Sequence, residues 1–229
     1  MRKNGIVIAI DGPAGAGKST TARLVAKRLD YLYLDTGAMY RAVGLAVVRE
    51  GFDADDGEAV VALARNLEIG QKAQGEESRT LLNGEDISDL IRTPDVSDAA
   101  SRVAVHPGVR ALMVLAQQAI GRNGGIVLEG RDTATAIFPD AELKVFLIAD
   151  VGARAQRRQK EMAQRGEKAD LASLEAQIQE RDERDRRTQL RLGPWPAKDA
   201  HRVDTTGVSI ASQVARVVEL ARECMKSDD

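Results

Sequence analysis

A short apolar run that leads directly into a glycine-rich stretch is the feature that most constrains the fold of this chain. Residues 6–10 read Ile-Val-Ile-Ala-Ile, a continuous β-branched run typical of a parallel strand buried on both faces. Residues 12–19 read Gly-Pro-Ala-Gly-Ala-Gly-Lys-Ser and fit the pattern G-x-x-x-x-G-K-[ST]. Apolar residues then recur at helical spacing, at Ala22, Val25, Ala26 and Leu29. The sequence therefore predicts a strand, a phosphate-binding loop and a helix in succession.

The chemistry expected of such a loop is phosphate binding. Backbone N–H groups and the positive end of the following helix surround phosphate oxygens. Lys18 is expected to reach the β- and γ-phosphates, and Ser19 to ligate Mg²⁺. The alternative is a glycine-rich turn with a surface lysine, which the two flanking elements disfavour. The predicted ATP-binding residues are Gly12, Pro13, Ala14, Gly15, Ala16, Gly17, Lys18, Ser19 and Thr20.

The rest of the chain continues the alternation of strands and helices. Short apolar runs at 31–34, 126–128, 145–148 and 201–203 alternate with helix-like segments. This order predicts an α/β fold with a parallel sheet covered by helices on both faces. The region 52–121 interrupts the alternation, so we interpret it as an inserted lobe.

Local signals mark a hairpin and three later helices. Asn83-Gly84 follows an apolar run and predicts a two-residue hairpin turn. Asp150 and Ser209 are expected to cap helices, and another helix is expected over 170–187. Buried positions are predicted at Leu171, Leu174 and Ile178 in the 170–187 helix, and at Val214, Val217, Val218 and Ala221 in the last one.

Composition limits the classes of partner. The 229 residues suit one large domain or one domain with an inserted lobe. Lys and Arg number 33 against 35 Asp and Glu, a balance that favours neither nucleic acid nor membrane as partner. The only cysteine, Cys224, excludes an intrachain disulfide, and the early apolar run is too short for a signal peptide. We expect a monomer in the cytoplasm.

Arginines at strand ends narrow the function further. The chain has no Asn-Lys-x-Asp stretch for guanine recognition, which argues against a GTPase. Kinases of small phosphorylated acceptors need several arginines to bring two polyanions together. Arg41 follows one predicted strand, with Thr36 expected to cap the next helix, and Arg131 with Asp132 follows another. The alternatives are a cap with a solvated charge for the first pair and a structural ion pair for the second.

Two further groups of charges are ambiguous. Arg154, Arg157 and Arg158 lie within about one helical turn and could form a solvated helix face or contact phosphates. Residues 181–187 carry opposite charges at i,i+4 spacing, which stabilises any exposed helix.

Taken together, these stretches resemble the bacterial cytidylate kinases over nearly the whole chain. The resemblance is carried by residues 10–13, 34–41, 91–94, 130–132, 138–141, 181–185 and 204–206. It implies a five-stranded P-loop kinase core over residues 1–35, 105–150 and 188–229. It also implies a nucleotide-monophosphate-binding lobe at about 36–104, a short lid at about 151–170 and a long helix to about 187.

The resemblance also implies an activity and a set of site residues. The reaction would transfer the γ-phosphoryl group of ATP, with Mg²⁺, to CMP and dCMP. Thr36, Ser101, Arg110 and Asp132 would face cytosine, Arg41 and Arg131 would hold the acceptor phosphate, and Arg181 and Asp185 would contact the sugar. Tyr40 would also belong to the acceptor site, and Arg157 to the ATP site. Catalytic roles would fall to Lys18, Arg131, Arg154 and Arg158.

The chain departs from the family pattern at two positions. Ala134 replaces a glycine, so a backbone with positive φ would be strained there. Thr188 replaces an arginine, for which Arg187 or Arg191 is expected to substitute. The alternatives to a cytidylate kinase are another small-molecule kinase, acting on UMP or shikimate, and a regulatory module that binds nucleotide without transfer. A nucleic-acid-binding ATPase is disfavoured by the charge balance and the few aromatic residues.

Overall fold

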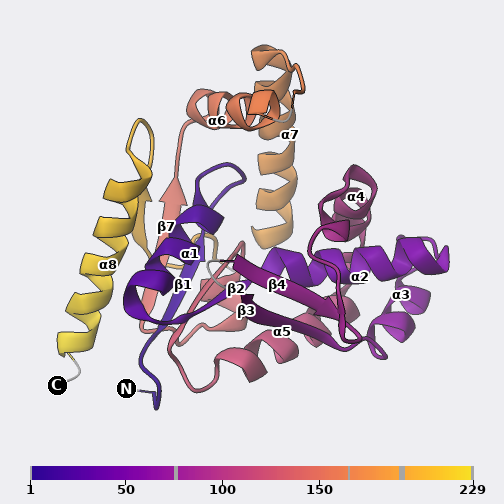
Figure 1. Cartoon of the computed structure of the whole chain (residues 1–229), viewed down its shortest axis with the longest axis horizontal. Helices are drawn as coiled ribbons and strands as arrows, with labels where there is room; N and C mark the ends of the chain where they lie inside the picture. Colours follow the sequence, from indigo (N-terminus) through magenta and orange to yellow (C-terminus); the bar gives the residue numbers. More distant parts are fainter. Residues whose placement is uncertain (1, 75–76, 165, 191–193, 228–229) are drawn as a thin grey trace. The chain divides into compact units, whose positions relative to one another are not determined.

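The computed structural model describes residues 2–74, 77–164, 166–190 and 194–227 and is drawn in Figure 1. The chain forms two compact units. The first combines Met1–Tyr31 with Gly124–Asp229, and the second comprises Leu32–Asn123. The assignment of functional core, lobe and lid to residue ranges stays a prediction.

The first unit contains most of the sheet and the helices that flank it. Its elements are β1 (Val7–Asp11), α1 (Lys18–Leu29), β6 (Ile126–Gly130), η2 (Thr133–Ile137), β7 (Leu143–Ile148), α6 (Val151–Gln164), α7 (Leu171–Leu190), β8 (His201–Asp204) and α8 (Ile210–Ser227). The elements of the second unit are β2 (Leu32–Asp35), α2 (Thr36–Glu50), α3 (Gly57–Ala64), β3 (Ile69–Gln74), β4 (Glu77–Leu82), β5 (Glu85–Asp86), η1 (Leu90–Arg92), α4 (Pro94–Val103) and α5 (Pro107–Gly121).

The five-stranded sheet has the order β2-β6-β1-β7-β8. β1 runs parallel to both neighbours, with Ala9 opposite Leu128 on one side and Ile10 opposite Val145 on the other. All five residues of β1 are buried, as its β-branched sequence predicts. The α/β class with a parallel five-stranded sheet flanked by helices on both faces is confirmed.

Helix packing in the first unit follows the predicted apolar stripes. α8 packs against α1 and β7 and buries the four predicted positions, Val214, Val217, Val218 and Ala221. α6 and α7 pack together at the top of Figure 1, where Ala155, Leu174 and Ile178 form a small buried cluster with Leu171 at its margin. Both predicted caps are present, since Ala153 N donates to Asp150 Oδ1 at 2.7 Å and Ser212 N to Ser209 Oγ at 3.2 Å. α7 continues three residues beyond its predicted end.

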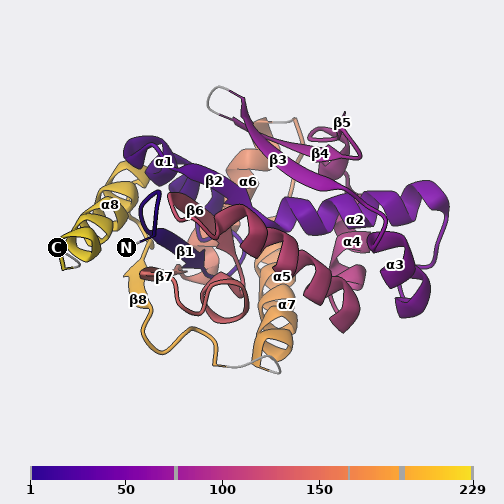
Figure 2. The same ribbon diagram turned by 90° about the horizontal axis from the view of Figure 1, so that it is seen from below.

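The second unit contains helices and a small antiparallel sheet, seen from below in Figure 2. α2 packs tightly on α4, because a Cβ at Gly44 would lie 2.8 Å from Ala100 N. β3, β4 and β5 form the sheet. The turn between β4 and β5 is the predicted Asn83-Gly84 pair, with φ angles of 51° and 83°, the positive values that such a hairpin turn requires.

The carboxyl ends of the strands of the first unit bring polar residues to one edge of the sheet. Because β1, β6, β7 and β8 run parallel, the residues that follow them emerge on the same side. These residues are Gly12, Arg131, Asp150 and Thr205. Within the described part of the chain, no helix is long and apolar enough to cross a membrane.

Candidate functional site

The loop between β1 and α1 has the backbone geometry that its glycines predict. Gly12 has a φ of 149°, and a Cβ there would lie 2.3 Å from the carbonyl oxygen of Leu147. Gly17 has a φ of 89° at the N-cap of α1. Lys18 is buried, and its Nζ donates to the Pro13 carbonyl at 2.9 Å. The loop therefore curls around its own lysine at a helix N-terminus, the arrangement that binds phosphate.

Burial makes the charge of Lys18 costly. Loss of solvation, together with the nearby Arg131 guanidinium, lowers the pKa of Lys18 to about 7, while the carboxylates of Glu129 and Asp11 oppose the shift. An ammonium in this position gains most from an added anion, since opposite charge favours its charged form.

Glu129 is a site residue that the sequence did not single out for this role. The Ser19 hydroxyl donates to Glu129 Oε1 at 2.7 Å, and the Glu129 side chain is buried at the end of β6. The sequence predicted that a strand ends next to Glu129, which was a partial signal for a site residue. Only the pairing of β6 with β1 brings Glu129 close to Ser19. The hydroxyl and the carboxylate form an oxygen-rich pair beside the loop.

Arg154, from the predicted arginine helix, is buried against the loop. Its guanidinium makes two hydrogen bonds to the Asp182 carboxylate, at 2.9 and 2.5 Å, and a third to the Ala14 carbonyl at 3.1 Å. This bidentate geometry orients the planar guanidinium strongly. The structure therefore brings Arg154 of α6 to the phosphate-binding loop, with Asp182 of α7 as its partner.

Arg157 contacts the same loop from the next turn of α6. It donates to the Gly15 carbonyl at 3.3 Å and to Thr205 Oγ1 at 3.2 Å, and also hydrogen-bonds the Thr205 carbonyl. Thr205 in turn donates to the Ala16 carbonyl at 3.2 Å. Arg158, in contrast, is exposed.

Arg131 and Asp132 lie between β6 and the helical turn η2. Arg131 Nε donates to Asp185 Oδ2 at 2.8 Å, so the ion-pair partner seen for Arg131 is on α7. Asp132 is buried. Arg181, one turn before Asp185 on α7, is exposed. The structure thus groups Arg131 and Asp185, two of the predicted acceptor residues.

The prediction that the backbone is strained at Ala134 is wrong. Thr133–Ile137 form a helical turn, so Ala134 does not need the positive φ that would favour glycine. Its N–H donates to Asp11 Oδ2 at 3.0 Å, while Asp11 Oδ1 accepts from Thr133 N at 2.9 Å and Thr133 Oγ1 at 2.8 Å. Burial raises the pKa of Asp11 to about 6, against the opposing effect of these hydrogen bonds.

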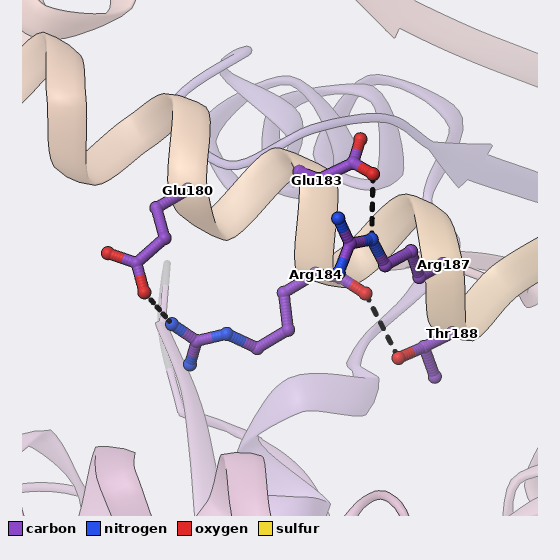
Figure 3. A pocket seen from close by; sticks show the side chains of 5 residues that line it. All are labelled: Glu180, Glu183, Arg184, Arg187 and Thr188. Carbon is purple, nitrogen blue, oxygen red and sulfur yellow. Dashed lines mark hydrogen bonds and ion pairs between the residues drawn. The ribbon is translucent and has the colours of Figure 1, made fainter.

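A cavity of about 390 Å³ lies along α7 at the second departure from the family pattern, and Figure 3 shows five residues that line it. The Thr188 hydroxyl donates to the Arg184 carbonyl at 3.0 Å, and Arg187 Nε donates to Glu183 Oε1 at 2.8 Å. Arg187 is therefore next to Thr188 at the cavity, whereas Arg191 lies outside the described residues. The lining residues are Glu180, Glu183, Arg184, Arg187 and Thr188.

In the second unit, Asp35 organises the start of α2. The prediction that Thr36 caps this helix is wrong: Asp35 is the cap and accepts from Ala38 N at 2.8 Å, while Thr36 is buried as the first helical residue. Either side chain can cap, but the chain enters the helix one residue earlier. Asp35 also accepts from Arg41 Nη2 at 2.9 Å. Arg41 Nε is buried and has no hydrogen-bond partner among the described residues.

The other predicted acceptor residues of this unit lie on three helices. Tyr40 is half-buried on α2, Ser101 is exposed on α4, and Arg110 on α5 donates to the Ala104 carbonyl at 3.3 Å. Gln71 of β3 was not predicted as a site residue. Its side-chain amide accepts from Asp35 N at 3.0 Å and donates to Asp35 O at 2.6 Å.

Comparison with known proteins identifies a kinase family, in agreement with the phosphate-binding geometry of the loop. The family model described as cytidylate kinase matches residues 8–223. The chain is 45% identical over 222 residues to a cytidylate kinase of Geobacillus sp. (strain WCH70), covering 96% of this chain and 98% of that protein. It is 44% identical over 220 residues to a cytidylate kinase of Citrifermentans bemidjiense, covering 96% and 93%.

Among solved structures, a protein with little sequence identity shares the fold of this chain. An uncharacterized protein from Eubacterium ventriosum matches with a TM-score of 0.54 at 10% identity, covering 95% of this chain and 98% of that one. The family match and the identities to full-length relatives reach far beyond the phosphate-binding loop, which many families share. The chain belongs to the cytidylate kinase family.

Proposed function

We infer that this chain is an ATP-dependent cytidylate kinase, which transfers the γ-phosphoryl group of ATP to CMP and releases ADP and CDP. The observation that carries this inference is the family match across residues 8–223, combined with the phosphate-binding geometry at Lys18. A UMP/CMP kinase or a shikimate kinase is not favoured, because the full-length relatives share 44–45% identity with this chain and are cytidylate kinases.

The reaction needs no catalytic base. The acceptor phosphate is already an oxyanion near neutral pH, so catalysis consists mainly of positioning and charge neutralisation. The Lys18 ammonium neutralises charge between the β- and γ-phosphates. We propose that Arg154 and Arg157 orient the ATP phosphates, and that Arg158 joins them when substrate is bound.

Magnesium fits the residues beside the loop. Ser19 Oγ and Glu129 Oε1 are 2.7 Å apart, and both are the hard oxygen donors that Mg²⁺ prefers. A group of three or more His, Cys, Asp or Glu side chains able to hold a metal is not found in the described parts of the chain. Mg²⁺ at nucleotide sites is usually held by one or two protein groups and the substrate phosphates. Bound Mg²⁺ would neutralise charge that develops on the transferred phosphoryl group.

We propose that a set of arginines and polar residues binds CMP or dCMP. Arg41 has a buried Nε without a partner in the described chain, which supports a role in binding the acceptor phosphate, because such a donor gains a charge-assisted hydrogen bond. We propose that Arg131 binds the same phosphate. The proposed contacts to base and sugar are Thr36, Ser101, Arg110, Asp132, Arg181 and Asp185, and Tyr40 is a further proposed residue of the acceptor site. The monomeric state and the cytoplasmic location stay predictions.

The test is to measure kcat/KM for all eight ribo- and deoxynucleoside monophosphates, with ADP release as the readout. Cytosine presents a donor at N4, which suits Asp132, whereas uracil presents an acceptor there. A buried mismatch of this kind costs about 1–3 kcal/mol, and such sites discriminate by about 10⁴. In the wild type, kcat/KM for CMP should far exceed kcat/KM for UMP. Asp132→Ala should reduce that preference, because the variant loses activity toward CMP. Equal values for CMP and UMP in the wild type would instead indicate a broad pyrimidine nucleotide kinase.

A further inference from the structure

The backbone of Arg131 has a hydrogen-bond donor that comes from a distant part of the chain. Trp195 Nε1 donates to the Arg131 carbonyl oxygen at 2.7 Å. This carbonyl belongs to the peptide group that joins Arg131 to Asp132. The bond therefore restrains the peptide group that connects the two proposed acceptor residues.

The other end of this short stretch is restrained as well. The Thr133 and Ala134 N–H groups both donate to the buried carboxylate of Asp11. Asp132 thus lies between a peptide group held by Trp195 and two peptide groups held by Asp11, and Arg131 directly precedes the peptide group held by Trp195. The backbone of Asp132 is therefore restrained on both sides, so its side-chain direction depends on both anchors, and that of Arg131 depends on the peptide group held by Trp195.

The indole ring of Trp195 is itself held in place. It contacts the Phe146 ring of β7 edge-to-face, with 5.1 Å between ring centroids and 84° between planes. Phe146 is buried in the central sheet. The ring contact and the hydrogen bond to the Arg131 carbonyl together fix the direction of the N–H of this half-buried indole.

We propose that Trp195 is a positioning residue for phosphoryl acceptance, which fixes the Arg131–Asp132 peptide so that both side chains address the acceptor nucleotide. This inference rests on the proposed roles of Arg131 and Asp132. It concerns the acceptor rather than ATP, because the phosphate-binding loop is held by contacts that do not involve Trp195.

The test removes the N–H donor and keeps the ring. Trp195 is the only tryptophan of the chain, so replacing tryptophan throughout by the analogue with sulfur in place of the indole N–H changes one position. We expect kcat/KM for CMP to fall about tenfold, as for a lost hydrogen bond to a positioned group, with KM for ATP within about twofold of the wild type. Trp195→Phe should behave similarly if it folds.

Two controls separate the possible causes. Phe146→Leu removes the ring contact that orients the indole, so it should lower Tm and raise KM for CMP in the same direction as the sulfur analogue, with KM for ATP nearly unchanged. Equal losses for CMP and ATP with the sulfur analogue, or no loss at all, would overturn the inference. Arg131→Ala is measured in parallel. If it abolishes CMP use while the sulfur analogue is silent, only the role of Trp195 fails, and if it has no effect, the acceptor role of Arg131 fails.

Discussion

Lys18 and its neighbours illustrate how single residues prepare the site for a polyanion. The ammonium is buried among two carboxylates and a guanidinium, and its pKa in the free protein is about 7. Such a group is poorly charged in the free protein above neutral pH. A triphosphate bound beside it would restore the charge, because nearby negative charge raises the pKa of an ammonium.

Proton uptake on binding ATP·Mg²⁺ should follow from this pKa. At pH 8 free Lys18 is mostly neutral, so binding should take up close to one proton, whereas at pH 6 Lys18 is already protonated and uptake should vanish. Calorimetric titration in two buffers of different ionisation enthalpy measures the uptake. Lys18→Ala should abolish it and reduce phosphoryl transfer by about 10²–10³-fold. A folded Lys18→Ala variant with near wild-type activity would contradict the assignment of the loop.

Arg187 should substitute for the arginine absent at Thr188. It lines the cavity beside Thr188, so Arg187→Ala should raise KM for CMP several-fold and leave KM for ATP nearly unchanged. Arg186→Ala is the matched control, because Arg186 also pairs with Glu183, at 2.9 Å. If the two variants behave alike, Arg187 has no special role and the acceptor site functions without it.

At the scale of elements, Gln71 connects β3 to the end of β2. Its side-chain amide pairs with both backbone groups of Asp35, in the way that a neighbouring strand would. Asp35 in turn caps α2 and holds Arg41. The small sheet therefore supports the start of the helix that carries a proposed phosphate ligand.

Gln71→Leu should weaken both stability and acceptor binding. Losing the two hydrogen bonds should lower the free energy of unfolding by about 1–3 kcal/mol and raise KM for CMP more than KM for ATP, because Arg41 loses its oriented partner. Ser78→Ala is the control, since the Ser78 hydroxyl contacts Gln71 Oε1 only at 3.4 Å. A stability loss with an unchanged KM for CMP would restrict Gln71 to a structural role.

Gln117 should be a source of instability within α5. The side chain is fully buried, and neither amide atom has a hydrogen-bond partner among the described residues. Because an unsatisfied buried polar group costs about 1–3 kcal/mol, Gln117→Met should raise Tm by a few degrees in a thermal melt. Gln118→Met is the control, since Gln118 has a partner. A lower Tm for Gln117→Met would show that the amide is satisfied in solution.

At the scale of the whole molecule, the protein binds two polyanions although its own formal net charge is −2. Attraction must therefore come from local groups rather than from the overall field. We propose that the local groups are the buried or half-buried Lys18, Arg41, Arg131, Arg154 and Arg157.

Substrate binding should stabilise the folded chain. At a concentration of CMP 100 times its dissociation constant, linkage adds about 2.7 kcal/mol, which corresponds to a rise in Tm of about 5–10 °C for a protein of this size. Scanning calorimetry with CMP, with UMP at the same concentration and without ligand measures the shift. UMP should raise Tm much less, and equal shifts would contradict base selectivity in binding.

The sequence by itself determined the local structure of this protein. The strand, loop and helix around residues 6–29, the Asn83-Gly84 turn and the Asp150 and Ser209 caps each depend on residues close together in the chain, so their patterns are readable directly. The family resemblance followed from seven short stretches between residues 10 and 206, and the family match bears it out. The cap of α2 was placed one residue late, because Asp35 and Thr36 have equivalent capping chemistry and only the backbone path selects between them.

The tertiary structure decided which distant groups meet. Ser19 and Glu129, Asp11 and Thr133, Arg154 and Asp182, and Arg131 and Trp195 are all pairs separated by tens to more than a hundred residues. Sheet order and helix packing determine these partners, and no local sequence pattern predicts them. Ala134 shows the same effect: Asp11, far away in the chain, holds its backbone in a helical turn, so the residue that looked strained in the sequence is accommodated without strain.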